Sequence, residues 1–576
     1  MLMRYIRVKE ANCKNCYKCL KHCAVKSISY INDRVEVIED GCILCGRCIN
    51  VCPQKAKTVV NDPAAVLGML ADPGVRTVAS LAPSYIGVYG RENRGRFIAA
   101  LKALGFDEVQ ETALGAHEVS LRYKELLDAG EMPAVLGTCC PAVNDLIVKY
   151  YPSLTPLMAP VVSPALAHGR LIKQEQGADT RVVFVGPCLA KIKEIAEHPE
   201  SADAVLSFRM LDKLLADRGI DPAGLPEDEA PLPAPFSRIY PIPEGVVRDV
   251  RGAAGTESSA YNGYRFMSVC GLENVMEFLK ELEAGHIGRV FAELNACDGG
   301  CVNGPLIAED KRAAYRGLLE VESYAEASAP VESRPIALGQ AFEAEPLEPP
   351  MPDEATIRKI LTEIGKPTPD KELNCGSCGY PTCRDKAIAV YQKKAELYMC
   401  LPYINDLSQS LSNVTLSVSP NLILAVDRDL RIVELNLTAQ KLFGVTRQMA
   451  LKADLYEFMD PADFEEVFQT HRNILDKKVK LDPLNIITSQ TLIYVPDQEL
   501  VMGFIKDITE EEQAKEKNFR ARLESAEMAQ KVIEKQMIAA QEIASLLGET
   551  TAETKVTLNL LKDLMLDEAG SADRKG

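Results

Sequence analysis

The chain has 576 residues, of which 47% are hydrophobic, so its length predicts several domains with packed cores. Its net charge is −17 and it has no long basic block, which argues against nucleic acid as a partner. No stretch of about 18 uninterrupted apolar residues is present, and residues 1–10 carry charges throughout, so neither a membrane span nor a signal peptide is expected. We therefore expect a soluble, cytoplasmic protein.

Eighteen cysteines stand out in a chain of this size. Without an export signal, cysteines so clustered favour metal binding over disulfides. Eight lie within residues 13–52, five in three stretches between residues 137 and 301, and four within residues 375–400, while Cys270 stands alone. Exposed thiolates and metal–sulfur clusters oxidise readily, so we also expect an anaerobic or well-reduced setting.

The first eight cysteines form two copies of the pattern C-x2-C-x2-C-x3-C. In this pattern three thiolates hold one [4Fe–4S] cubane and the fourth reaches the other cluster. The prediction is one cluster on Cys13, Cys16, Cys19 and Cys52, and a second on Cys42, Cys45, Cys48 and Cys23. A pair of zinc knuckles is the alternative, but zinc knuckles lack this interdigitated spacing. Residues 3–60 resemble a bacterial two-cluster ferredoxin, which implies a domain over residues 1–62 that carries electrons between a docking partner and the interior.

Residues 75–325 alternate apolar, strand-like runs with helical stretches, which predicts an α/β domain. The expected strands include residues 77–81, 182–185, 266–269 and 290–292, and the expected helices include 96–104 and 272–282. Five cysteines follow three of the apolar runs, in residues 137–141, 186–191 and 293–301. Cysteines at the ends of buried strands could converge on one metal site. We interpret Cys270, expected to begin a helix, as a core thiol.

These three cysteine stretches resemble the signature motifs of the catalytic domain of [FeFe] hydrogenases. The resemblance implies an H-cluster, in which a [4Fe–4S] cubane is bridged to a di-iron subsite with CO, CN⁻ and azadithiolate ligands. It implies that Cys139 passes protons, that Lys191 donates to a cyanide, and that Pro83 and Ser84 line another cyanide. The implied ligands of the cubane are Cys140, Cys188, Cys297 and the bridging Cys301.

Two blander interpretations remain open for this site. Lys191 could be a solvated helix lysine, and Cys139 a passive neighbour of a ligand. A related class of iron–sulfur assembly proteins has the four ligand cysteines without a di-iron subsite. The presence of both Cys139 and Lys191 argues against that class.

Several positions depart from the family pattern. Ala142 and Val143 stand where catalytic members have Gly-Trp, Gly186 replaces a methionine, and Asn295 replaces the methionine that packs over the di-iron subsite. Such changes alter polarity and hydrogen bonding around a metal centre. The proton relay of the family, which runs through a carboxylate, a serine and a second carboxylate, is also changed. Ala159 stands at the serine position, and Glu194 keeps the position of the inner carboxylate. Glu125 is kept in the helix, but Arg122 stands near the position of its partner. We expect slow or differently routed turnover.

Residues 326–355 are rich in Ala, Glu and Pro, which predicts a linker or a poorly ordered strap. The pattern C-x2-C-x4-C-x16-C follows, on Cys375, Cys378, Cys383 and Cys400. It resembles the small [4Fe–4S] domain of corrinoid iron–sulfur proteins and some electron-transport subunits, and it predicts such a domain over residues 356–411 with a helix at 384–397. Zinc is the alternative metal.

Residues 412–509 resemble a PAS domain, with strands expected at 422–426, 431–435, 485–494 and 500–505 and helices at 438–443 and 462–475. No cysteine is present there for a flavin adduct, and we interpret His471 as a surface or packing residue more readily than a haem ligand. The PAS ligand is unknown, and an empty pocket used for protein contact is the expected state.

A long charged segment, residues 510–566, carries apolar residues at a spacing of seven. The two series are Leu523, Gln530, Met537, Ala544 and Ala526, Ile533, Ala540, Leu547. This predicts a coiled-coil seam in a homodimer, or else an amphipathic helix packed on its own domain. No histidine follows His471, so output would need a separate partner protein.

The order of domains resembles the sensory-type [FeFe] hydrogenases, in a multidomain α/β and α+β architecture. The resemblance implies that the protein senses H2, splits it reversibly and slowly, and signals through its Fe–S clusters to the PAS domain. A catalytic ferredoxin-linked hydrogenase is one alternative, and an Fe–S redox regulator without a di-iron subsite is another.

Overall fold

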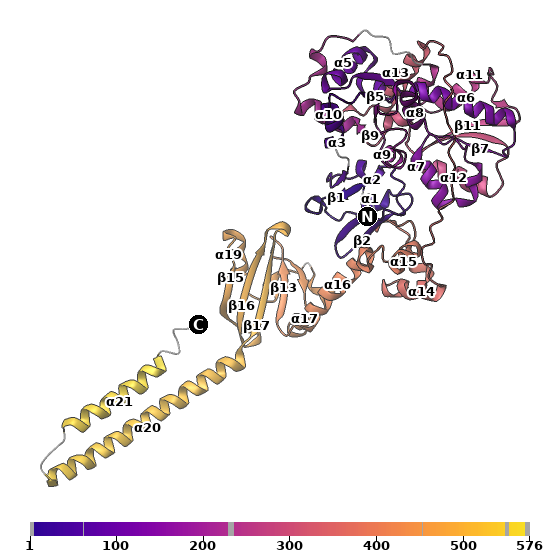
Figure 1. Cartoon of the computed structure of the whole chain (residues 1–576). Helices are drawn as coiled ribbons and strands as arrows, with labels where there is room; N and C mark the ends of the chain where they lie inside the picture. The colour runs from indigo at the N-terminus through magenta and orange to yellow at the C-terminus, as the bar shows by residue number, and fades with distance from the viewer. Residues whose placement is uncertain (1–4, 61–62, 229–234, 452, 548–551, 571–576) are drawn as a thin grey trace. The chain divides into compact units, whose positions relative to one another are not determined.

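The computed structural model describes residues 5–60, 63–228, 235–451, 453–547 and 552–570. They divide into two compact units, Met1–Ile404 and Asn405–Gly576, each treated by itself (Figure 1). In the described part of the chain, no helix is long and apolar enough to cross a membrane.

The N-terminal part of the first unit contains two small antiparallel strand pairs. Strand β1 (Ile6–Val8) pairs with β4 (Lys57–Val59), and β2 (Ile28–Ile31) pairs with β3 (Arg34–Val37). Each cysteine repeat carries one short helix, α1 (Lys18–Lys21) or α2 (Arg47–Asn50), which holds Cys19 or Cys48. This arrangement gives the two repeats equivalent local structure.

Two four-stranded sheets form the centre of the first unit. One has the order β6-β5-β8-β9 and is parallel throughout; the other has the order β10-β11-β12-β7 and is parallel except for β10. Every residue of β5 and β12 is buried, which explains why these strands are largely apolar in sequence and do not alternate polar with apolar residues. The strands are β5 (Thr77–Leu81), β6 (Glu108–Glu111), β7 (Val135–Leu136), β8 (Arg181–Gly186), β9 (Ala204–Ser207), β10 (Ala260–Tyr261), β11 (Tyr264–Cys270) and β12 (Val290–Asn295).

Helices surround the two sheets (Figure 1). Helices α6 and α8 approach closely because position 115 is glycine, where a Cβ atom would lie 2.4 Å from the His168 backbone nitrogen. The helices are α3 (Pro63–Ala71), α4 (Tyr85–Tyr89), α5 (Arg94–Leu104), α6 (Ala113–Ala129), α7 (Pro141–Tyr150), α8 (Pro164–Gln176), α9 (Ala190–Glu197), α10 (Phe208–Asp217), α11 (Gly245–Ala253), α12 (Leu272–Glu283) and α13 (Ala314–Glu326).

One helix boundary was predicted wrongly. Cys270 does not begin a helix, because it is the last residue of β11. Gly271, with a φ of 90°, turns the chain before α12 begins at Leu272.

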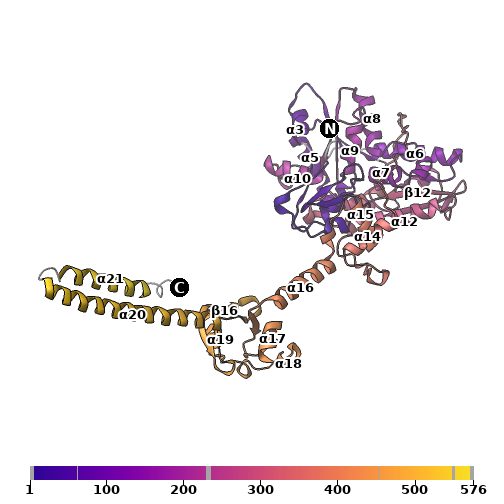
Figure 2. The same cartoon turned by 90° about the horizontal axis from the view of Figure 1, so that it is seen from below.

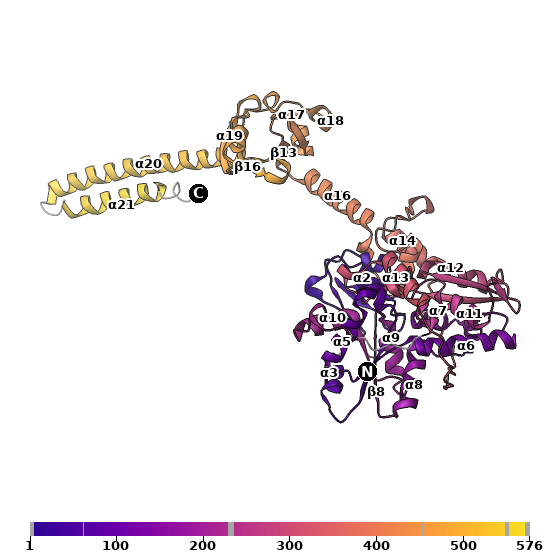
Figure 3. The ribbon, with the colours of Figure 1, turned by 90° about the horizontal axis from the view of Figure 1, so that it is seen from above.

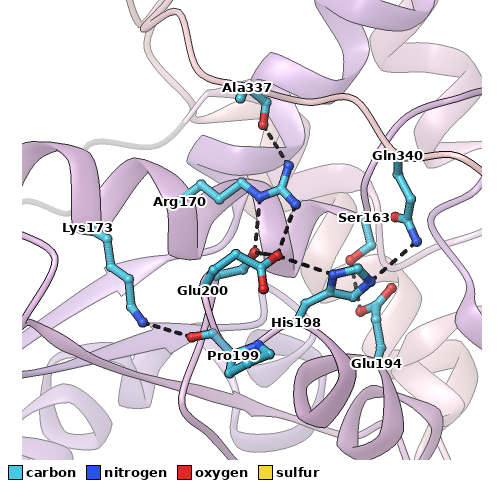
Figure 4. A network of polar contacts seen from close by, with 10 residues as sticks. Ser163, Arg170, Lys173, Glu194, His198, Pro199, Glu200, Ala337 and Gln340 are labelled. Atoms are coloured by element: carbon cyan, nitrogen blue, oxygen red, sulfur yellow. Dashed lines mark hydrogen bonds and ion pairs between the residues drawn. The ribbon is translucent and has the colours of Figure 1, made fainter.

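The Pro- and Ala-rich segment is not a poorly ordered strap, because much of its backbone hydrogen-bonds to the central domain. The Val162 backbone N–H donates to the Leu338 carbonyl at 2.9 Å, and the Glu345 N–H donates to the Val148 carbonyl at 2.9 Å. Arg170 donates to the Ala337 carbonyl, and Gln340 contacts His198 (Figure 4). Residues 333–347 therefore form a strap fixed along the domain surface.

The small cysteine domain packs on the N-terminal part. Its helices are α14 (Glu354–Glu363) and α15 (Cys383–Tyr391), so the helix predicted to reach residue 397 ends six residues earlier. The Tyr30 N–H donates to the Lys394 carbonyl at 2.9 Å, and Lys26 Nζ donates to the Gly379 carbonyl at 2.9 Å. Gly379 lies against Leu20, because a Cβ atom there would be 2.3 Å from Leu20 Cδ2.

The second unit begins with a five-stranded antiparallel sheet of order β14-β13-β17-β16-β15. One predicted helix was too long: α19 ends at Thr470, and the edge strand β15, which includes residues 474 and 475, was missed. The elements are β13 (Leu422–Val426), β14 (Ile432–Leu435), α17 (Leu437–Phe443), α18 (Arg447–Ala450), α19 (Ala462–Thr470), β15 (Ile474–Leu481), β16 (Ile486–Val495) and β17 (Leu500–Asp507), preceded in the chain by α16 (Leu401–Val418).

The charged C-terminal segment folds as two helices, α20 (Thr509–Leu547) and α21 (Ala552–Gly570), which lie side by side (Figures 1, 2 and 3). The expected single helix is therefore a hairpin. Ala526, Ile533 and Met537 of the predicted seam are half-buried, whereas Leu523 and Ala540 are exposed. Ala544 and Leu547 belong to the part of α20 whose side chains lie outside the description. Part of the heptad pattern thus serves packing within one chain.

Candidate metal centre

The three central cysteine stretches converge on one mostly apolar cavity of about 110 Å³. Strand topology explains part of this convergence, because β7 and β12 are parallel neighbours in one sheet and both end directly before cysteines, whereas β8 leads to Cys188 from the other sheet. Its wall includes Cys139, Cys140, Cys188 and Cys301. Cys301 borders the cavity, which accounts for its exposed surface in a region otherwise enclosed by protein.

The cavity cysteines are strongly shielded from water. Burial raises the pKa of Cys188 to about 11 and that of Cys139 to about 12. Burial also raises the pKa of Cys297, and the neighbouring Cys301, Cys140 and Cys188 thiols add to the rise. Such thiols become thiolates only when a positively charged centre compensates for burial, as a bound metal does.

A buried ion pair lies at the same wall. Lys191, from the first turn of α9, donates through Nζ to Glu194 Oε2 at 2.6 Å, and Ser163 Oγ donates to the same oxygen at 2.9 Å. Figure 4 shows the Ser163 and Glu194 side chains pointing toward one another. Because Lys191 also borders the cavity, its ammonium can donate a hydrogen bond to an anionic group bound inside the cavity.

The expected contact residues after β5 lie beside the cavity. Pro83 is part of its wall. Ser84 is buried, and among the described residues its hydroxyl has no hydrogen-bond partner. A buried hydroxyl without a partner is costly, so this atom is free to bond a group bound nearby, but Ser84 itself is not part of the cavity wall. The residues present therefore fit the H-cluster that the motifs imply.

Asn295 borders the cavity and is held by a carboxyl group that the sequence did not single out. Its Nδ2 donates to Glu293 Oε1 at 2.8 Å, and Glu293 also accepts the Val246 and Val247 N–H groups at 3.0 and 3.1 Å. Burial raises the pKa of Glu293 to about 7. An acidic residue in a strand that is buried at every position was the available signal. Cys270 is half-buried, with its Sγ 3.8 Å from Asn295 Nδ2.

The other residues of the expected proton relay do not gather at the cavity. Arg122 and Glu125 form a 2.6 Å ion pair whose side chains are 42% and 62% exposed, so they lie at the surface. Ala159 is fully buried and offers no hydroxyl. Instead, Tyr123 Oη lies 3.3 Å from Cys139 Sγ, and Tyr240 borders the cavity. Sequence patterns gave no indication of either tyrosine.

The N-terminal cysteines lie next to the central site. Burial raises the pKa of Cys45 to about 11, and the nearby Cys23 and Cys140 thiols contribute to the rise. Lys57 Nζ is buried and has no hydrogen-bond partner in the described part of the chain, which suits a neighbouring anionic cluster. Its positive charge lowers the pKa of both Cys19 and Cys48, whose pKa values burial raises.

The four C-terminal cysteines line a second, much smaller cavity together with Lys386 and Tyr380. Tyr380 Oη is buried and lacks a partner among the residues described, and burial lowers the pKa of Lys386 to about 8. Across all described residues, no three His, Cys, Asp or Glu side chains lie close enough together to hold a single metal ion.

His471 is the last residue considered from the sequence. It is exposed, adopts a φ of 54° at the end of α19, and stacks on Tyr494 with ring centroids 4.4 Å apart. It therefore acts as a helix-terminating, packing residue in this fold, as the simpler interpretation predicted.

Comparison with known families gives matches for four parts of the chain. Residues 75–305 match the iron only hydrogenase large subunit, C-terminal domain. Further matches are to a 4Fe-4S binding domain over residues 35–58, an Fe-S cluster family over 372–402 and the PAS fold over 409–508. The central part of the chain is thus similar to [FeFe] hydrogenases, and other parts are similar to iron–sulfur domains and to the PAS fold.

Individual relatives share part of this architecture. The chain is 28% identical to iron hydrogenase 1 of Clostridium pasteurianum over 280 residues, which cover 40% of this chain and 48% of the relative. It is 29% identical to the NADP-reducing hydrogenase subunit HndD of Solidesulfovibrio fructosivorans over 301 residues, 42% of this chain and 51% of the relative. The matched region spans about half the length of each relative.

Solved structures show similarity at lower identity. An apo [FeFe]-hydrogenase from Chlamydomonas reinhardtii is 19% identical with a TM-score of 0.40, over 50% of this chain and all 100% of that chain. A PAS domain of an HTR-like protein from Haloarcula marismortui is 17% identical with a TM-score of 0.16, over 18% of this chain and 95% of that chain.

Proposed function

We propose that this protein is an H2-sensing [FeFe] hydrogenase of the cytoplasm. It binds and reversibly splits H2 with slow turnover, and it passes the resulting redox change through Fe–S clusters to the PAS domain and a separate output protein. Ferredoxin or another redox carrier would exchange electrons with it, and a homodimer is the proposed assembly.

One observation carries this proposal: the thiols of four motif cysteines, the Lys191 ammonium and the apolar wall meet at a single cavity. In the proposal Cys140, Cys188, Cys297 and Cys301 would hold the cubane of the H-cluster; of these four, Cys297 is not part of the cavity wall. When bound, the H-cluster supplies the site for heterolytic H2 cleavage and the first acceptor of electrons.

The protein residues around the cavity hold ligands and move protons. Cys139 carries the proton, since its Sγ borders the cavity and lies 3.3 Å from Tyr123 Oη. Lys191 and Ser84 donate to anionic ligands, with Pro83 beside them and Glu194 fixing the ammonium. Asn295, fastened to Glu293, presents a polar group at the position where catalytic members of the family have a methionine.

Slow turnover is proposed because residues of the family's usual proton relay are missing from this chain. Ala159 cannot hydrogen-bond, and Arg122 neutralises Glu125 at the surface. Sensing is proposed because the same chain carries a PAS domain and a helical hairpin in addition to its Fe–S domains. The three accessory [4Fe–4S] clusters would use the ligand sets expected from the sequence, in domains 1–62 and 356–411.

The proposal is tested by comparing two cysteine variants of the protein matured with the di-iron subsite. C139A should keep its iron content while its response to H2, followed by infrared bands of CO and CN⁻, slows by about a hundredfold. C270A is the control, because Cys270 is half-buried beside Asn295 and outside the proposed ligand set. An unchanged response in C139A would remove the proton-carrying role. Rapid H2 turnover with ferredoxin would instead favour a catalytic hydrogenase.

A further inference from the structure

A second set of polar side chains leads away from the cavity in a direction unrelated to the relay expected from the sequence. Tyr240 borders the cavity, as Cys139 does. Its hydroxyl lies 2.7 Å from Ser120 Oγ on α6; Ser120 is buried and Tyr240 is half-buried. The Tyr240 side chain therefore connects the cavity with the inner face of α6.

The hydrogen bonds continue in one direction. Ser120 Oγ donates to Asp249 Oδ2 on α11, so the Tyr240 hydroxyl is left to donate to Ser120. Ser237 Oγ donates to the same Asp249 oxygen at 2.6 Å but lies beside this path. Ser120 and Asp249 are 1% and 7% exposed, so water does not compete for these contacts.

Asp249, the last residue of this set, has a nearby group on the part of α6 that is partly exposed to solvent. Burial raises the pKa of Asp249, and His117 is a nearby group whose charge lowers it. His117 is half-exposed and lies three residues before Ser120, and residues at this spacing share a face of a helix. His117 thus offers Asp249 an exchange point with solvent.

We propose that Tyr240, Ser120 and Asp249 form the proton path between the cavity and His117, an inference that rests on the proposed function. A proton accepted at Tyr240 Oη is balanced by release of the Tyr240 hydroxyl proton to Ser120 Oγ. Ser120 in turn releases its own proton to the Asp249 carboxylate. The reverse sequence delivers a proton, and no electron or other atom is transferred.

This path accounts for proton access where the expected relay is missing. The cavity is otherwise lined mainly by apolar side chains such as Pro164, Ala165 and Val246. A purely structural role is the competing explanation, because the three residues also join α6, α11 and the segment before Tyr240. The two explanations differ at Ser237, which fastens Asp249 equally well but carries no proton between Tyr240 and Asp249.

The first test needs no di-iron subsite. In the full chain with its [4Fe–4S] clusters, an infrared carboxyl band is assigned to Asp249 by its loss in D249N, at a pH where the band is present. After rapid mixing with D2O, this band should shift at least about tenfold more slowly in H117L than in wild type, because His117 is the exchange point of Asp249 with solvent, but within about twofold of wild type in S237A. Equal exchange rates in wild type and H117L would overturn the path.

The second test uses the matured protein. Y240F, S120A and D249N should keep the CO and CN⁻ bands but respond to H2 at least about tenfold more slowly, with S237A close to wild type. Responses as fast as wild type in all three variants, or an equal slowing in S237A, would overturn the path. A matured wild-type protein with no H2 response would contradict the proposed function instead, and the D2O exchange would still decide whether Asp249 exchanges its proton through His117.

Discussion

Lys191 and Glu194 form a buried ion pair, with Nζ and Oε2 only 2.6 Å apart and side chains 9% and 8% exposed. Both belong to α9, which begins two residues after Cys188. The ion pair keeps the Lys191 ammonium at the cavity wall, where an unpaired ammonium would be unfavourable. The same pair therefore affects both the stability of the domain and the charge at the site.

Removing the charge of one member of this pair should lower the free energy of unfolding more than removing both charges. K191M leaves the Glu194 carboxylate buried with only Ser163 as a donor, so the free energy of unfolding should fall by about 3 kcal/mol. The double variant K191M/E194Q should lose much less than the sum of the single variants. Calorimetry of the protein without the di-iron subsite measures this coupling. Additive losses would show that the pair does not act as a unit.

Glu293 should make stability depend on pH. Its pKa is raised from 4.5 to about 7, mainly by burial, so the folded state favours the neutral carboxyl. The associated stability is present below pH 4.5 and is lost as pH rises through about 7, with a total of about 3 kcal/mol. In denaturant titrations, the difference between wild type and E293Q should change by this amount across that range. A difference independent of pH would contradict the buried, neutral form of Glu293.

Gly379 should control the docking of the small cysteine domain on the N-terminal part. An alanine Cβ there would lie 2.3 Å from Leu20 Cδ2, whereas at Gly376 the nearest atom is 3.8 Å away. Both glycines have positive φ values, 91° and 67°, so G376A is a control for backbone strain. Only G379A should speed hydrogen exchange of the Tyr30 amide, which donates to the Lys394 carbonyl. Equal exchange in the two variants would argue against this contact.

The C-terminal hairpin should depend on one face of α20. Ile533 is half-buried, while the neighbouring Val532 is 54% exposed. I533D should release α21 and speed proteolysis within residues 552–570, since burial of half an isoleucine contributes about 1 kcal/mol. V532D carries the same charge on the outer face and should leave the cleavage rate near that of wild type. Equal sensitivity of both variants would indicate that the two helices do not pack through this face.

Much of the fold could be predicted because local signals agree with the final structure. The strand-like runs of β5, β8 and β12 are buried strands, and cysteines that follow β8 and β12 meet at one cavity. The edge strand β15 was missed because Asp476, Lys477 and Lys478 make it polar and exposed. The heptad pattern indicated a seam but could not say that α21 of the same chain packs against it.

The candidate site was predictable only where its residues belong to a short sequence motif. The spacing of cysteines indicates how they can bind a cluster, so the central site could be expected from three stretches. The contact of Ser120 with Asp249 joins residues 129 positions apart, and that of Glu293 with Val246 spans 47 positions. Such pairs depend on helix packing, which no local pattern encodes.

The proposed function depends most directly on the bound group, and infrared spectroscopy of the matured wild-type protein tests it. We expect CO and CN⁻ bands after maturation with the di-iron subsite, and a reversible shift of these bands when argon is exchanged for H2. A protein with loaded [4Fe–4S] clusters but no CO and CN⁻ bands, or with bands unaffected by H2, would contradict it.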